Sequence, residues 1–115
     1  MYKELQVYRR ARLLSDTVYS CVEGWGSFDR WTVGQQLVRA GDSVGANIAE
    51  AYGRSSQGDR RRFIVIARGS ALEVEHWVET ALARGLDLPL ALGAESSEIS
   101  RMLHAMARQM GRGAT

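Results

Sequence analysis

The sequence predicts one all-α domain over residues 1–115, an antiparallel up-down-up-down four-helix bundle that assembles as a homo-oligomer. Apolar residues recur at intervals of three and four, the spacing of one helix face, in four successive segments. A single proline and short intervening stretches leave little room for long loops, so consecutive helices should pack antiparallel. The composition, 45% hydrophobic and 24% charged in 115 residues, is that of one folded domain.

The first two predicted helices cover about residues 3–24 and 30–53. The face of the first carries Val7, Ala11, Leu14, Val18, Cys21 and Trp25. Gly24, Gly26 and Ser27 should end it. The face of the second carries Val33, Leu37, Ala40, Val44, Ile48 and Ala51. Gly53 is the expected stop, because glycine is the preferred residue after a helix C-terminus.

The third and fourth predicted helices cover about residues 57–85 and 94–110. Ser56 or Asp59 should cap the third helix, and Gly85 should follow its end. Its face carries Phe63, Ala67, Ser70, Val74, Trp77 and Ala81. A loop with Pro89 precedes the fourth helix, whose face carries Ile99, Met102, Leu103, Met106 and Met110.

Two features indicate close packing or self-association. Five aromatic residues lie outside or beside the apolar faces: Tyr2, Tyr8, Tyr19, Trp31 and Tyr52. Gly41, Gly45 and Ala49 repeat every four residues, although each mid-helix glycine costs roughly 0.5–1 kcal/mol relative to alanine. Such a stripe lets a second backbone approach, either inside the bundle or between protomers.

A polar stripe runs beside the apolar face of the second predicted helix. It consists of Gln36, Arg39, Ser43, Asn47, Glu50 and Arg54. Because it lies only about 100° from the apolar face, part of it should be semi-buried. A polar line on the third predicted helix includes Arg62, Glu73 and His76. We predict a hydrogen-bond network at a bundle or subunit contact, in which Arg39 or Arg54 pairs with Glu50 or Glu73.

Basic residues are predicted to gather at one end of the bundle. The chain has 15 basic and 13 acidic residues, and Lys3 is its only lysine. In an antiparallel bundle the N-termini of the first and third helices share an end with the C-termini of the other two. The arginines expected there as a nucleic-acid or anion site are Arg9, Arg10, Arg12, Arg54, Arg60, Arg61 and Arg62. The alternative is a solvated arginine-rich end without a ligand.

No catalytic residue, metal site or cofactor is predicted. Cys21 lies on an apolar face, which indicates packing, and one cysteine allows no internal disulfide. Glu73 and His76 form one Glu-x-x-His element, but a bundle metal site usually needs two. A metal-dependent enzyme using these two residues is therefore the weakest hypothesis. No apolar run approaches the length of a membrane span, and we expect a reducing, cytoplasmic setting and no membrane partner.

The sequence resembles the 23S ribosomal RNA intervening-sequence protein family. The resemblance rests on Gln36-x-x-Arg39-Ala40-x-x-Ser43-Val44-x-x-Asn47-Ile48-Ala49-Glu50, followed by Gly53-Arg54. It extends to Leu5-x-Val7-Tyr8-x-x-Ala11 and to Phe63-x-x-Ile66-Ala67-x-Gly69-Ser70-x-x-Glu73-x-Glu75. It implies a bacterial, cytosolic four-helix bundle that forms a homopentamer and has no established catalytic activity. Related bundles are accessory proteins of diversity-generating retroelements, where they bind a reverse transcriptase and nucleic acid.

Two functions follow as hypotheses. The first is a non-enzymatic homo-oligomer in which Arg39, Ser43, Asn47, Glu50 and Glu73 build the bundle and its subunit contacts, while the arginine-rich end binds RNA, DNA or an acidic partner. The second is a scaffold or accessory factor for a protein partner, such as a reverse transcriptase, with no nucleic-acid role.

Overall fold

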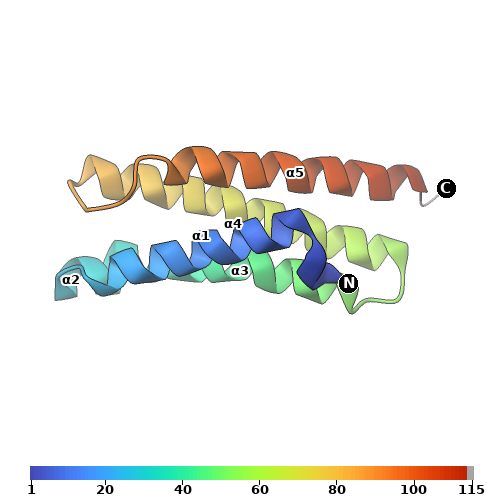
Figure 1. Ribbon diagram of the computed structural model, residues 1–115, viewed down its shortest axis with the longest axis horizontal. Helices are drawn as coiled ribbons and strands as arrows, with labels where there is room; N and C mark the ends of the chain where they lie inside the picture. The colour runs from blue at the N-terminus through green and yellow to red at the C-terminus, as the bar shows by residue number, and fades with distance from the viewer. Residues whose placement is uncertain (114–115) are drawn as a thin grey trace.

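A computed structural model describes residues 1–113 and shows four long helices lying side by side (Figure 1). The long helices are α1 (Gln6–Glu23), α3 (Gln35–Tyr52), α4 (Gln57–Ala83) and α5 (Leu92–Gly113). Three short elements complete the described chain: the 3-10 turn η1 (Tyr2–Glu4), α2 (Ser27–Asp29) and the π-helical turn η2 (Arg30–Gly34). The bundle measures 49 × 21 × 21 Å, and residues 1–113 contain no strand.

The four long helices alternate in direction. Each packs against two of the others, α1 against α3 and α5, and α4 against the same two. The start of α1 therefore shares an end with the α3–α4 connection and the end of α5, while α2 and the α4–α5 connection lie at the other end (Figure 1). The predicted antiparallel order is confirmed over the described residues.

The predicted helix boundaries hold with three differences. The first helix does not start at residue 3, because Leu5 is extended (ψ 132°) and separates η1 from α1. The second begins earlier, since α2 and η2 lead without a break into α3. The fourth is longer at both ends, from Leu92 to Gly113.

Two residues that we predicted at the ends of α4 are confirmed, one before its start and one after its end. The side chain of Ser56 caps α4, where its Oγ accepts a hydrogen bond from the Asp59 amide at 3.1 Å. Gly85 follows the end of α4 with φ +77°, a backbone conformation that residues other than glycine rarely adopt.

The core follows the predicted faces of α1 and α3, and four of the six residues predicted for the face of α4, Ala67, Ser70, Val74 and Ala81, are also buried. All six predicted residues of the second helix, Val33 to Ala51, are buried. The buried residues of α4 are Ile64, Ala67, Ser70, Ala71, Val74, Val78 and Ala81. Phe63 and Trp77, which we expected in the core, lie half-buried beside it. Of the α5 residues that we expected, Ile99 and Leu103 are buried, and Met102, Met106 and Met110 are half-buried.

Two glycines of α3 lie at its contact with α1. A Cβ atom at Gly41 would lie 3.7 Å from the Ser15 Cα atom, and one at Gly45 would lie 3.6 Å from the Tyr8 ring. These are ordinary van der Waals distances, so both positions face the inside of the bundle but have space for a methyl group. Cys21 is half-buried against the core, and burial raises the pKa of its thiol, which favours the unreactive protonated form.

None of the helices in the described part of the chain has an apolar stretch long enough to cross a bilayer.

We predict that Gly34→Ala destabilises the fold. A Cβ atom there would lie 2.6 Å from Val22 Cγ1 and 3.0 Å from the Asp29 carbonyl oxygen, so the turn and α1 would have to separate. Overpacking of this kind costs about 1–3 kcal/mol, measured as the free energy of unfolding in urea. Gly58→Ala is the matched control, because nothing lies within 4 Å of its Cβ position and the stability should stay equal or rise. Equal stability of Gly34→Ala and wild type would contradict the assigned contact.

Candidate nucleic-acid interface

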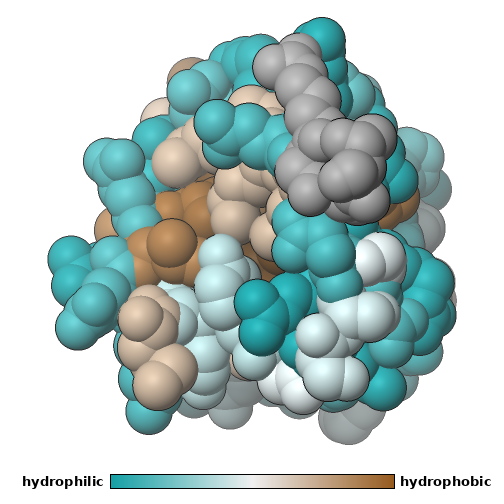
Figure 2. Space-filling model, turned by 90° about the vertical axis from the view of Figure 1, so that its right-hand side faces the viewer, coloured by the Kyte–Doolittle hydropathy of each residue, from teal (hydrophilic) through white to brown (hydrophobic). Residues whose placement is uncertain are grey.

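One end of the bundle carries most of its closely spaced arginines. We call it the arginine-rich end and define it by residues of the α3–α4 connection, of the first turns of α4 and of the last turns of α5. These residues are Arg54, Arg60, Arg61, Arg62 and Arg108. Figure 2 looks onto this end, where hydrophilic side chains surround apolar atoms that show between them. The carboxylates that pair with arginines here are those of Glu50 and Asp59.

Phe63 holds two of these arginines in place. The guanidinium carbons of Arg54 and Arg62 each lie 4.6 Å from the centre of its ring, within the range of a cation–π contact. Arg54 also pairs with Glu50 at 3.0 Å, and Arg62 with Asp59 at 3.3 Å. The predicted Arg54–Glu50 pair is confirmed. We predicted Phe63 in the core, but its half-buried ring instead contacts two arginines at this end.

Arg60 and Arg61 are anchored by only one nitrogen each. The Nε atom of Arg60 donates to the Arg54 carbonyl at 2.8 Å, and that of Arg61 donates to the Ala107 carbonyl at 3.0 Å. Gly111 leaves space for Arg61, because a Cβ atom there would come within 3.3 Å of that Nε atom. Within residues 1–111, whose side chains the structure describes, no hydrogen bond engages the Nη atoms of these two side chains. Each guanidinium group is thus held through Nε, and its Nη donors remain available for an anion.

The charges of Arg60, Arg61 and Arg62 are unfavourable in the dipole of α4. Residues 60–62 lie near the start of α4, where a cation is disfavoured and an anion is favoured. Asp59 supplies one negative charge in the first turn. A bound polyanion would add more negative charge and interact with the helix terminus and the arginines together.

The structure corrects the prediction for Arg10. Its guanidinium binds Glu95 through two hydrogen bonds, of 2.9 and 2.6 Å, and both side chains are about two-thirds buried. Arg61 instead contacts Ala107 on the same helix α5. At about 1.5 Å of rise per residue, these two arginines are separated by roughly 18 Å along the bundle. Arg10 is a structural contact between α1 and α5.

Arg9 and Arg12 also lie away from the arginine-rich end. Neighbouring Tyr8 packs beside Gly45, and at about 1.5 Å per residue Arg54 lies ~13 Å further along the bundle. Arg12 donates to the Tyr8 hydroxyl and lines a cleft between α1 and α3, together with Ser15, Asp16 and Asp42. Arg9 donates to the Lys3 carbonyl at 3.4 Å. The expectation that all seven arginines share one end was wrong because α1 starts short of the ends of α4 and α5.

The predicted polar network forms between α3 and α4 with different partners. The hydroxyls of Ser43 and Ser70 lie 2.8 Å apart, and Asn47 donates to both the carbonyl and the hydroxyl of Ser43. Ser70 was assigned to the apolar face, although a serine among apolar residues is itself a signal of a buried partner. Arg39 and Glu73 are exposed and line a cleft of about 180 Å³ beside this contact.

The hypothesis of a metal site gains no support from geometry. No three metal-ligating side chains come together in the part of the chain that the structure describes. Glu73 and His76 are both exposed, and the His76 ring packs edge-on against Trp77 at 4.8 Å.

Comparison with known proteins gives a family and a fold. A family model described as 23S rRNA-intervening sequence protein matches residues 3–105. A similar solved structure is that of a protein of unknown function from the S23 ribosomal protein family of Bacteroides thetaiotaomicron. It has a TM-score of 0.78 at 23% identity, covering 88% of this chain and 97% of that chain. No curated protein matches the sequence.

The Arg10–Glu95 pair generates a pH-dependent prediction. The Arg10 guanidinium lowers the pKa of Glu95 below its usual value of about 4.3. A carboxylate with a lowered pKa in the folded state stabilises the fold above its unfolded pKa and loses this effect as pH falls through the folded value. Glu95→Gln should therefore destabilise the fold by about 1 kcal/mol at pH 7, measured by urea unfolding.

The difference from wild type should shrink below about pH 4.3 and vanish at lower pH. Glu98→Gln is the matched control, because Glu98 forms an exposed pair with Arg101 and its replacement should cost less than about 0.5 kcal/mol. A Glu95→Gln effect of equal size at pH 7 and pH 2.5 would contradict the role of the ion pair.

Proposed function

The chain belongs to the 23S rRNA-intervening sequence protein family, and we propose that it is a non-enzymatic, homo-oligomeric bundle that binds the phosphate backbone of RNA through its arginine-rich end. The observation that carries the proposal is the anchoring of Arg60 and Arg61 through Nε alone, which leaves oriented Nη donors. Guanidinium groups held in this way lose little conformational entropy on binding phosphate. The family's description associates it with sequences that interrupt 23S rRNA, which favours RNA as the polyanion.

The proposed contact is to phosphate and not to bases. Phe63, the aromatic ring at this end, is half-buried and already faces two guanidinium groups. A ring in this position offers little surface for stacking of bases. Binding should therefore depend on charge and salt and discriminate weakly between sequences.

Self-association would strengthen this binding. A few phosphate contacts per chain give only weak affinity, whereas several copies with their arginine-rich ends on one side would bind one RNA at several points. Five copies is the number that the family resemblance implies.

We predict a steep salt dependence of RNA binding that requires the α4 arginines. A fluorescein-labelled single-stranded RNA of about 20 nucleotides should bind at 50 mM salt and weaken steeply toward 200 mM. Replacing Arg60, Arg61 and Arg62 by alanine should reduce the slope of log K against log salt by about 0.7 for each phosphate group that is no longer bound. Replacing all three by lysine should retain most of the slope.

The control is a triple variant in which Arg9, Arg84 and Arg101 are all replaced by alanine. Its net charge changes by the same amount, and its substitutions lie away from this end. This control should keep most of the slope, and circular dichroism would check that every variant is folded. Absence of RNA binding at 50 mM salt would overturn the RNA proposal and favour a scaffold for a protein partner. Equally weakened RNA binding in the two alanine triple variants would do the same.

A further inference from the structure

Arg68, in the middle of α4, carries a buried donor without an acceptor. Its side chain is half-buried, and its Nε atom is covered from solvent and makes no hydrogen bond within the described part of the chain. Among residues 1–111, no carboxylate forms an ion pair with its guanidinium. Buried donors are usually paired with protein, water or a bound ion, because a missing acceptor is unfavourable. The fold of one chain therefore leaves this guanidinium without a partner.

The contact of Arg61 with α5 shows where Arg68 lies. The Nε atom of Arg61 donates to the Ala107 carbonyl and would lie 3.3 Å from a Cβ atom at Gly111. Arg68 follows seven residues later, so it occupies nearly the same face of α4 about 10 Å further along the axis. Because α5 runs antiparallel to α4, the same step leads from Gly111 back to His104 (Figure 1). Arg68 thus lies at the height of His104, which is exposed.

These residues belong to a basic line along the packed helices α4 and α5. We call it the α4–α5 strip, and it consists of Arg61, Arg68, His104 and Arg108. Arg108 shares a face of α5 with His104, because residues four apart in a helix are neighbours. No arginine of the strip is ion-paired in the part of the chain that the structure describes. Arg101 lies on the same face of α5 but pairs with Glu98 at 2.8 Å, so we leave it out of the strip.

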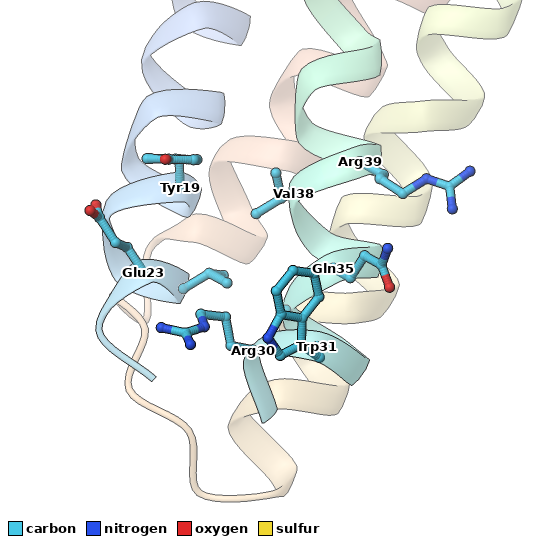
Figure 3. A pocket seen from close by; sticks show the side chains of 9 residues that line it. Tyr19, Glu23, Arg30, Trp31, Gln35, Val38 and Arg39 are labelled. Carbon is cyan, nitrogen blue, oxygen red and sulfur yellow. The ribbon is translucent and has the colours of Figure 1, made fainter. Parts of the chain in front are cut away.

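The unpaired arginines in the other half of the bundle have a different setting. Arg30 and Arg39 lie beside a pocket of about 300 Å³ between α1 and the segment formed by η2 and the start of α3. Its apolar lining comes from Tyr19, Val22, Trp31 and Val38. In Figure 3 the two guanidinium groups point to opposite sides of the Trp31 ring. These charges form no line, and an apolar pocket does not suit a phosphate group.

We propose that the RNA backbone continues from the arginine-rich end along the α4–α5 strip, where Arg68 binds a further phosphate group. A small rotation would turn the Nε and Nη donors of Arg68 toward phosphate oxygens, the geometry in which guanidinium groups bind them best. This rotation breaks no ion pair and no hydrogen bond of Nε. The strip ends toward Glu75, two turns beyond Arg68, where a carboxylate would repel the backbone. The inference rests on the proposed function and extends its site along one side of the bundle.

Arg68→Met in the full chain tests the contact, because methionine keeps apolar packing and removes the charge. Binding of the same labelled RNA should weaken about 5-fold at 0.1 M salt, and the slope of log K against log salt should fall by about 0.7. The thermal unfolding midpoint should stay equal or rise, because the variant removes a buried donor without an acceptor. A midpoint that falls together with the affinity would make Arg68 a structural residue and would overturn the inference.

Arg84→Met is the matched control, because it changes the net charge equally. Arg84 follows the end of α4, about 24 Å from Arg68 along the helix. This distance is more than twice the Debye length at 0.1 M salt, so the affinity for RNA should change less than about 2-fold. An equal loss of affinity in Arg68→Met and Arg84→Met would assign the effect to net charge and contradict a contact at Arg68.

The Nε–H group of Arg68 gives a direct measurement in the wild-type chain. Its nitrogen-15 NMR signal is identified by its absence from the spectrum of Arg68→Met. Addition of RNA should shift this signal together with those of Arg60 and Arg61, whereas the Arg84 signal should stay in place. Inorganic phosphate alone is the comparison, because a site for a free anion would respond to it as well.

The outcomes separate this inference from the RNA proposal. RNA that shifts the signals of Arg60 and Arg61 but not that of Arg68 would overturn the path along the strip and leave the arginine-rich end as the RNA site. A shift of the Arg68 signal by inorganic phosphate but not by RNA would indicate a separate anion site and would also overturn the path. A chain that binds no RNA in the salt titration would overturn both proposals.

Discussion

The structure depends on the burial of one continuous stripe of branched and small side chains on each long helix. Leu14, Leu37, Ile64 and Ile99, one from each helix, are fully buried in the same core. Burial of such a side chain contributes about 1.5–3 kcal/mol each, which is large against the net stability of a small domain. The stripes fix how each helix is rotated about its axis, and this rotation decides which residues remain on the surface. The arginine-rich end is one consequence of it.

The helices start at different heights along the bundle, and these heights determine which charged residues meet. Because α1 starts short of the ends of α4 and α5, Arg10 reaches the first turn of α5 and finds Glu95 there. The first turns of α4 lie further out, where Arg60 and Arg61 meet only backbone carbonyls. A basic side chain beside a carboxylate stabilises the fold, whereas one anchored on a carbonyl keeps its charge unneutralised. Axial position thus separates Arg10, which is ion-paired, from Arg60 and Arg61, which are not.

The sequence predicted the bundle well, because apolar residues spaced three and four apart over 20 residues fit few structures other than a helix. It predicted the face of α4 less well, since Phe63 and Trp77, which are half-buried, follow the helical spacing as closely as the buried Ile64 and Val78. The position of α1 along the bundle depends on the extended residue Leu5 and on the contact at Gly45. Neither feature can be recognised from the spacing of apolar residues in the sequence. The grouping of Arg9 with Arg54 could therefore not be tested by spacing alone.

The first turns of helix α4 carry most of the arginine-rich end. Copies that associate with their long axes parallel would place their arginine-rich ends side by side on one face of the assembly. Each additional copy then raises the local density of guanidinium groups without any change within the chain. The small net charge of +2 is compatible with this arrangement, because polyanion binding depends more on how charges are grouped than on their sum.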